Sequence, residues 1–391
     1  MSASTDMLPQ AASSRPHWAT FGAMVLARIT FGYQIQTVAS LGPQLQAAFG
    51  IEFALLGTLM GLMQLPGIAA AIPSGFLARR FGDRRVIAGG MVMMVLGSMI
   101  SAFAHGPIGI GVGRVVAGCG AVALTVLQPK AVADRFSGNA FNIAMGILVG
   151  AFPLGIGLGQ LTQGRLAAAF GWQAAFMAGA VLALISMTVL WTTWRNVGAT
   201  TSRAMNWPSR HEMVLLALAG MIWSCFNAGY FNFLGFLPSV IAHSGMPGWV
   251  ADASIFMASW GNLPTMMLGG AVAARLGVVP VFLVASILMV IAVGGMGLEN
   301  WPLVWSVLFG TFATMHAGII VAWGTLSAKP ENRAVGMGIF YTVYYIGGSI
   351  SPALCGHAAD LMGSPSGAFL CAGALTALAI PFWWWHRRLS G

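Results

Sequence analysis

Long apolar stretches recur along the whole chain, and each is close to the length that a helix needs to cross a lipid bilayer. About 20 mainly apolar residues span the hydrocarbon core as a helix, and only helices and closed barrels satisfy their own backbone hydrogen bonds there. Barrel strands alternate apolar and polar side chains, whereas these stretches are continuously apolar. Of the 391 residues, 58% are hydrophobic and 7% are charged, which is too little charge to cover soluble domains. The sequence therefore predicts an all-α integral membrane protein.

Glycine, proline or charge separates these stretches into twelve predicted membrane-spanning helices, in two sets of six. The first set is 18–42, 53–77, 86–104, 108–128, 140–163 and 171–194. The second set is 212–238, 250–273, 278–298, 301–325, 334–357 and 366–386. The chain then divides into a polar tail (1–17), a six-helix bundle (18–194), a cytoplasmic linker (195–211), a second six-helix bundle (212–386) and a C-terminal tail (387–391). The run that starts near Trp18 is too long for a signal-peptide core, so we expect it to remain as the first span.

Lysines and arginines gather on one side of the predicted helices. With the N-terminus inside, all but three of the 18 basic residues fall in inner loops or tails; Arg165 falls outside, and Arg28 and Arg114 fall within spans. Because basic residues resist translocation, this asymmetry predicts cytoplasmic N- and C-termini in a multi-pass protein of the cytoplasmic (inner) membrane. The net charge is +9, but the basic residues are distributed along the chain and form no clustered basic face. We therefore expect the lipid bilayer, and no nucleic acid, as a partner.

The motifs of enzymes and cofactor sites are absent from the sequence. No G-x-x-x-x-G-K-[ST] segment occurs, so no phosphate-binding loop for ATP is expected. The four cysteines lie in or beside apolar runs without C-x-x-C spacing or a histidine partner, which favours small core residues over metal ligands. The sequence predicts that the protein is not an enzyme and has no cofactor, no metal site and no catalytic residue.

The two sets of helices carry weak internal repeats. The segment GFLARRFG at 75–82 matches GAVAARLG at 270–277, and each follows the second span of its set. Likewise Gly32-Tyr33 in the first span matches Gly229-Tyr230 in the seventh. Such pseudo-symmetry is typical of secondary transporters, whose substrate site lies between the halves near the middle of the membrane.

Three segments carry a resemblance to a known family. The segment GFLARRFGDRR at 75–85 resembles the loop between helices two and three of the major facilitator superfamily, RVVAGCGA at 114–121 resembles a motif of its fourth helix, and FGWQAAF at 170–176 is similar to its entry into helix six. The resemblance implies two pseudo-symmetric six-helix bundles that alternate access by a rocker-switch motion. The gating and motif residues that it implies are Gly75, Arg79, Gly82, Asp83, Arg84, Arg85, Gly118, Gly120 and Pro153.

The chain departs from the family pattern at two positions. Arg79 stands where the family has an acidic residue that is implicated in holding the outward-facing state, and the acid of this chain is Asp83. Either Asp83 substitutes for that residue or the gate is built differently. In GILVGAFPLGIGLG, Phe152 precedes Pro153 where the family's antiporter motif usually has glycine, which weakens an antiporter interpretation. The glycines at 75, 82, 118 and 120 are expected to let helix backbones approach closely.

Two arginines lie inside predicted spans, Arg28 near the middle of the first and Arg114 in the fourth. An arginine at the bilayer centre costs about 2.5 to 3.5 kcal/mol, so it usually has a partner or a role. All nine carboxylates lie in loops or at span ends, although Glu52, Asp252 or a backbone carbonyl could reach one of these arginines if the boundaries shift. Planar guanidinium groups suit two-point binding of a carboxylate or another small oxyanion. We therefore favour an anion site over a structural ion pair.

Helical spacing adds neutral residues to this site, because in the family's fold helices one, four, seven and ten line the cavity. Thr125 shares a face with Arg114, and Gln36 lies beside the line through Arg28. The candidate substrate-binding residues are Arg28, Arg114, Gln36, Thr125, Asn227, Tyr230 and His316. Aromatic side chains would form the walls of the cavity, and the candidate lining residues are Trp223, Phe312, Trp323, Tyr341, Tyr344 and Tyr345.

The functional hypothesis is a secondary transporter that moves a small organic or inorganic anion, with faint similarity to cyanate, nitrate and monocarboxylate carriers. His316 is the only group placed in the middle of a predicted span that could titrate near neutral pH, so anion exchange, proton symport and facilitated diffusion all stay open. A drug exporter of the proton-antiporter type is the runner-up. A transporter-derived sensor or a lipid-handling protein is the third hypothesis. We expect a monomer whose partners are the anion and either protons or a counter-anion.

Overall fold

The structure, a computed structural model, describes residues 18–194 and 207–390, and all regular secondary structure within these ranges is helical. The predicted tail 1–17 and residues 195–206 of the predicted linker lie outside the described residues. The helices of the first half are α1 (Trp18–Ser40), α2 (Gly42–Phe49), α3 (Phe53–Gly61), α4 (Gly67–Phe81), α5 (Asp83–Ala102), α6 (Pro107–Ala133), α7 (Gly138–Phe170) and α8 (Gln173–Thr193).

The second half follows the same plan after the linker. Its helices are α9 (Arg210–Ser244), α10 (Gly248–Trp260), α11 (Asn262–Leu276), α12 (Val278–Met296), α13 (Pro302–Phe312), α14 (Ala317–Leu326), α15 (Arg333–Met362), α16 (Ser366–Ala377) and α17 (Ala379–Ser390). Helix α9 begins in a capping box, because Ser209 accepts from the backbone N–H of Glu212 while the carboxylate of Glu212 accepts from the backbone N–H of Ser209. This cap starts the helix at Arg210, two residues before the predicted span.

Each of the twelve predicted spans coincides with one helix or with two consecutive helices, which confirms the predicted all-α membrane architecture. Eight described segments, with α13–α14 and α16–α17 each taken together, are long and apolar enough to cross a membrane. Several helices run past the predicted ends, since α9 and α15 contain 35 and 30 residues. Helix α17 continues through Ser390, so residues 387–390 of the predicted C-terminal tail are helical. The basic residues Arg387 and Arg388 lie in its last turn, where a positive charge interacts favourably with the negative end of the helix dipole.

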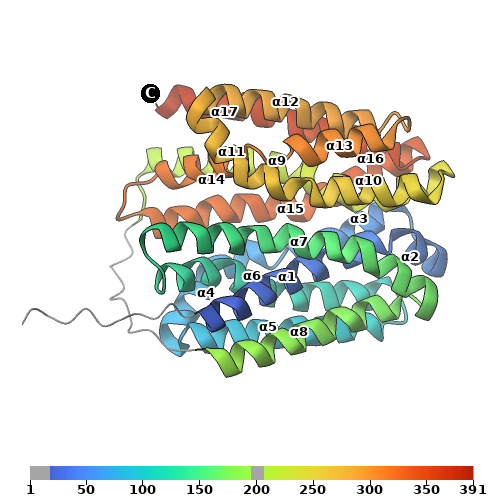
Figure 1. Cartoon of the computed structure of the whole chain (residues 1–391), viewed down its shortest axis with the longest axis horizontal. Helices are drawn as coiled ribbons and strands as arrows, with labels where there is room; N and C mark the ends of the chain where they lie inside the picture. The colour runs from blue at the N-terminus through green and yellow to red at the C-terminus, as the bar shows by residue number, and fades with distance from the viewer. Residues whose placement is uncertain (1–17, 195–206, 391) are drawn as a thin grey trace, which may run out of the picture.

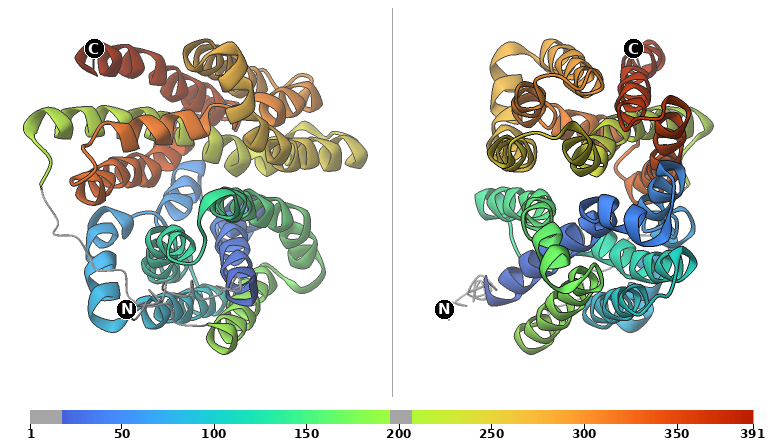
Figure 2. Two further views of the ribbon diagram at one scale, coloured as in Figure 1. Left: turned by 60° about the vertical axis from the view of Figure 1, so that its left-hand side comes forward. Right: turned by 90° about the vertical axis from the view of Figure 1, so that its right-hand side faces the viewer.

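The helices form two groups that lie side by side along the long axis of the molecule. In Figure 1, helices α1–α8 occupy the lower part and α9–α17 the upper part, and Figure 2 shows the same two groups from two further directions. The end of α17 and helices α4 and α14 lie at the left of Figure 1, which is the end that the basic loops assign to the cytoplasm. Helices α2 and α10 lie at the opposite, outer end.

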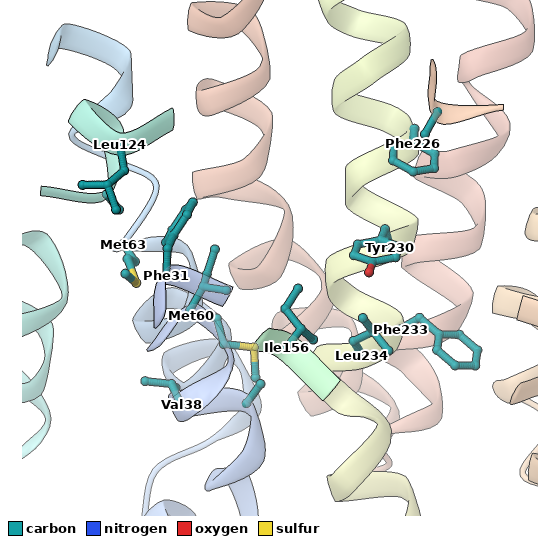
Figure 3. Packing of buried hydrophobic residues seen from close by; sticks show 14 of the residues in the cluster. Phe31, Val38, Met60, Met63, Leu124, Ile156, Phe226, Tyr230, Phe233 and Leu234 are labelled. Atoms are coloured by element: carbon teal, nitrogen blue, oxygen red, sulfur yellow. The ribbon is translucent and has the colours of Figure 1, made fainter. Parts of the chain in front are cut away.

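Apolar side chains fill the contact between the two halves. In Figure 3, Met60 of α3 and Ile156 of α7 extend toward Leu234 of α9. Many large apolar side chains on the outside are exposed instead, and Ile108 of α6 is 84% exposed. Such a surface fits lipid rather than water.

The hydrogen bonds that the described residues form between the halves lie from the middle of the molecule to its outer end. Helices α3 and α15 pack against each other, and the carboxylate of Asp360 near the end of α15 accepts from the backbone N–H groups of Phe53 and Ala54 at 2.8 Å each. Nearer the middle, Gln64 donates to the carbonyl of Gly348 at 3.3 Å. These contacts close the outer end of the molecule.

The motif glycines fall into two kinds. A Cβ at Gly118 would overlap the carbonyl oxygen of Met63, and one at Gly120 would overlap that of Gly90, so the expected close approach of backbones is present there. At Gly75 and Gly82 a Cβ would meet nothing within 4 Å, and the expectation of close packing is wrong for these two. Gly82 has a φ of +84°, so its lack of a side chain serves the sharp turn between α4 and α5.

Candidate functional site

Arg28 of α1 lies in the middle of the first half with most of its hydrogen-bonding capacity unused. Its Nη1 donates to the hydroxyl of Thr125 on α6 across 3.4 Å, a long and weak bond. The Nε of Arg28 is buried without a hydrogen-bond partner, and within the part of the chain that the structure describes no carboxylate forms an ion pair with it. The side chain is half-buried, so its charge is only partly shielded from ligands.

Two phenylalanines flank the guanidinium group of Arg28. Its Cζ lies 5.6 Å from the ring centre of Phe31 on α1 and 5.2 Å from that of Phe152 on α7. The two rings contact each other with centroids 4.9 Å apart. Neither phenylalanine was a predicted site residue. Two signals for them were present, since Phe31 follows Arg28 by one helical turn and Phe152 replaces the glycine that the resemblance led us to expect.

Three tyrosines of α15, a helix of the second half, lie near Arg28. Tyr341, Tyr344 and Tyr345 all lie close enough to interact electrostatically with its charge. Tyr345 is buried against Gly67 of α4, where a Cβ would overlap the tyrosine ring. Trp223 of α9 extends this aromatic group, because its ring lies 6.3 Å from that of Tyr344. The structure therefore brings together Arg28, Thr125, Trp223 and the three tyrosines, all of which were predicted, and adds Phe31 and Phe152. We call these residues the Arg28 cluster.

Arg114 is bound very differently from Arg28. Its side chain on α6 is 3% exposed and donates to four backbone carbonyls. Two belong to α1, Gln34 at 2.6 Å and Ile35 at 3.0 Å, and two belong to α3, Leu59 at 3.3 Å and Met60 at 3.5 Å. Helix α3 ends at Gly61, so the carbonyls just before this break lack part of their helical bonding. Arg114 thus ties α1, α3 and α6 together.

The predicted polar residues Gln36 and Tyr230 have partners outside the Arg28 cluster, and Asn227 is bonded within its own helix. Gln36 is buried and donates to the carbonyl of Leu234 on α9 at 3.2 Å, which joins the two halves. Asn227 donates within its own helix to the carbonyl of Trp223 at 2.7 Å. Tyr230 is stacked between Phe226 and Phe309, with ring centroids 6.0 and 5.8 Å away. Figure 3 shows Tyr230 and Phe226 along one side of α9.

His316 and Trp323 pack inside the second half, at and after the break between α13 and α14. His316 is 1% exposed, and the rings of Phe226 and Phe282 meet it edge-on at 5.2 and 5.7 Å. Trp323 contacts Phe282 at 4.9 Å. Phe312 ends α13 and is partly buried. These surroundings are those of an aromatic core.

The family-like loop residues lie at the inner ends of α4, α5 and α6. Asp83 accepts from the Nζ of Lys130 at 2.7 Å, and the same nitrogen lies 3.3 Å from Asp134. Arg84 donates to the carbonyl of Trp191 on α8 at 2.6 Å and lies 4.1 Å above its ring. Arg79 is exposed near the end of α4, and Arg85 is exposed on α5. Pro153 is buried inside α7, next to Phe152.

Comparison with known proteins places the chain in a family. It is 25% identical to the 3-(3-hydroxy-phenyl)propionate transporter of Escherichia coli over 89% of this chain and 88% of that protein. It is also 25% identical to the inner membrane transport protein YajR of Escherichia coli, over 84% of this chain and 74% of that one. The gallate transporter of Pseudomonas putida matches at 25% identity over 41% of this chain and 36% of that protein.

The fold agrees with this placement. The inward-open structure of the xylose transporter XylE from E. coli superposes with a TM-score of 0.77 at 14% sequence identity, over 94% of this chain and 95% of that one. At this identity the likeness concerns the fold alone. The sequence profile of the Major Facilitator Superfamily matches residues 24–352, which is most of the chain. The protein therefore belongs to the major facilitator superfamily and is a multi-pass membrane transporter.

Proposed function

We propose that the protein transports a small organic anion, specifically an aromatic carboxylate, and that Arg28 binds the carboxylate. The observation that carries the proposal is the state of Arg28, a guanidinium group inside the helix bundle with one long hydrogen bond and a buried Nε that has no acceptor. A charge inside a helix bundle in the membrane without a counter-charge is costly. A carboxylate from the substrate would supply both the negative charge and the missing acceptors.

The aromatic part of the proposed substrate is supported by the walls around Arg28. Phe31 and Phe152 lie on the side of the first half, and Tyr341, Tyr344 and Trp223 lie on the side of the second. Aromatic rings favour offset or edge-to-face contact with another ring, and the tyrosine hydroxyls could hydrogen-bond phenolic groups. Similarity to transporters of 3-(3-hydroxyphenyl)propionate and gallate, both aromatic acids, supports the same substrate class.

Arg114 has a different part in this proposal. Its five N–H donors face four carbonyl oxygens, so we assign it to holding α1, α3 and α6 together rather than to direct contact with substrate. We assign a structural role of the same kind to four other predicted site residues, because their contacts are with neighbouring protein groups: Gln36, Asn227, Tyr230 and His316. In this proposal the protein is a monomer in the cytoplasmic membrane, and it transports its substrate by alternating access.

The proposal is tested by uptake into proteoliposomes that contain the purified protein. Labelled 3-(3-hydroxyphenyl)propionate, gallate and 4-hydroxybenzoate are the test substrates, nitrate and cyanate are small anions without a ring, and ethidium is an aromatic cation. We expect uptake of at least one aromatic acid. Loss of a charged hydrogen bond is worth about 1.5 to 3 kcal/mol, so Arg28→Ala should lower kcat/KM by about 10- to 100-fold. Arg28→Lys should retain part of the activity, because it keeps the charge and loses the two-point geometry.

The matched control is Arg275→Ala, which removes the same charge from the exposed end of α11. It should leave uptake unchanged. Transport of ethidium in place of the acids would support the drug-exporter alternative and contradict the proposal. Uptake of an aromatic acid that Arg28→Ala leaves intact would contradict the role of Arg28. Repeating the uptake with and without an imposed pH gradient separates proton symport from exchange and facilitated diffusion.

A further inference from the structure

A groove on the outside of the first half lies where α4 and α5 diverge. The two helices meet at the Gly82 turn, and Leu77 and Phe81 of α4 face Met93 of α5 across a cavity of about 490 Å³. Small residues of α6, among them Cys119, line its floor. On the other side of α5, a second cavity of about 480 Å³ lies against Met187 and Trp191 of α8. We call the two cavities the α5 groove.

Two residues of α5 line both parts of the groove, Arg85 at its inner end and Gly89 one turn further along. A Cβ at Gly89 would meet nothing within 4 Å, so this glycine keeps the ridge between the two cavities low without packing against another helix. The remaining walls are mostly apolar, and Leu77 and Phe81 are 46% and 48% exposed. The groove therefore opens toward the lipid.

The charge at the inner end of the groove has no partner within the described residues. Arg84 is engaged with Trp191, and Asp83 is paired with Lys130. Arg85 has neither a hydrogen bond nor an ion pair in the described ranges, and it is exposed at the end that the basic loops assign to the cytoplasm. An arginine at headgroup depth above an apolar groove complements a lipid with a negative headgroup and an apolar tail.

We propose that the α5 groove binds one anionic phospholipid of the cytoplasmic leaflet, with the phosphate on Arg85 and an acyl chain lying along Gly89 between α4 and α8. The site is separate from the Arg28 cluster, and it requires no particular transport substrate. A lipid in this position would fill the space that the divergence of α4 from α5 leaves open, and would brace the inner end of the first half.

Lipid titration followed by native mass spectrometry tests the proposal on the purified, delipidated full-length protein. The probes are phosphatidylglycerol and phosphatidylcholine with the same acyl chains. One arginine near the headgroups is worth about 1 kcal/mol, so the first phosphatidylglycerol should bind about fivefold more tightly than the first phosphatidylcholine. Arg85→Gln should weaken phosphatidylglycerol more than phosphatidylcholine and so abolish this preference, because only phosphatidylglycerol carries a net negative charge. Gly89→Leu places a large side chain on the ridge between the two cavities and so fills the groove. It should remove the first tight adduct of both lipids.

Gly270→Leu is the matched control, because a Cβ at this glycine also meets nothing within 4 Å and the residue lies on α11 of the second half, away from the α5 groove. It should retain the preference for phosphatidylglycerol. If Gly89→Leu lowers the yield of folded protein, Leu77→Trp fills the groove from the α4 wall and should have the same effect. Equal affinity of the wild type for the two lipids, or a preference that survives Arg85→Gln, would overturn the proposal. Retention of the first adduct in a variant with a filled groove would also overturn it.

Discussion

At the scale of single residues, the two arginines in the membrane differ because of what their donors reach. Arg114 meets four carbonyl oxygens, whereas Arg28 meets one hydroxyl at 3.4 Å and two aromatic faces. The sequence presents both as uncompensated charges, because no carboxylate shares a span with either. A backbone carbonyl was a possible partner for either arginine, but residue types cannot show which carbonyl lies in reach, since every residue has one.

Phe152 is the residue-scale feature that best tests the aromatic wall of the site. Phe152→Leu keeps an apolar side chain but removes the ring face that lies 5.2 Å from Arg28. A cation–π contact in a partly desolvated site is worth about 1 kcal/mol, so we expect KM for an aromatic acid to rise about fivefold. Phe76→Leu, at an exposed position on α4, is the control and should have no effect. An unchanged KM in Phe152→Leu would show that this ring does not contribute to substrate binding.

At the scale of helices, the break after Gly61 and the side chain of Arg114 depend on each other. The chain between α3 and α4 leaves the regular helix, and carbonyls near such a break need other donors within the membrane. Arg114 supplies them from α6 at the same time as it binds two carbonyls of α1. Gly118, one turn further along α6, lets the helix approach Met63 inside this break.

This dependence predicts that replacing Arg114 lowers the stability of the protein, rather than lowering its substrate affinity alone. Arg114→Met leaves several carbonyls without donors, and each buried unsatisfied group costs about 1 to 3 kcal/mol, so the free energy of unfolding should fall by about 3 kcal/mol. Thermal unfolding in detergent, followed by tryptophan fluorescence, measures the change. Arg114→Lys should also destabilise the protein, since one ammonium group cannot reach all four oxygens. A stable Arg114→Met protein that has lost only substrate affinity would argue for direct binding.

At the scale of the whole molecule, the two halves are joined near their outer ends. Asp360 of α15 caps the start of α3 across the interface, and Arg165 of α7 forms a 3.1 Å ion pair with Asp252 of α10. The cap places a negative charge at the positive end of a helix, which is favourable by about 0.3 to 1 kcal/mol at a surface and more when partly buried. Both contacts must break for the outer end to open.

On the proposed alternating-access mechanism, removing the cap should therefore shift the molecule toward the outward-open state. We expect Asp360→Asn to raise the ratio of outward-open to inward-open molecules about fivefold, which corresponds to about 1 kcal/mol. Electron–electron distance measurements between nitroxide labels at Ala48 and Leu298, in a background without the native cysteines, report on this ratio. Asp252→Asn is the comparison and should have a smaller effect, because its ion pair is highly exposed. Identical distance distributions for Asp360→Asn and the parent would contradict the assigned role of the cap.

The number and order of the spans follow from the sequence alone, because hydropathy and helix length are local properties that the bilayer thickness converts directly into helices. The resemblance to the family likewise follows from short local motifs, and the profile match over residues 24–352 confirms it. Helix ends were harder to predict, as the extension of α17 to Ser390 shows, because amphipathic turns continue past the hydrocarbon core. Only the tertiary structure decided that Arg114 has several hydrogen-bond acceptors and that Arg28 has one. The carbonyls that bind Arg114 and the phenylalanine beside Arg28 come from distant parts of the chain, so only the packing of α1, α3, α6 and α7 brings them together.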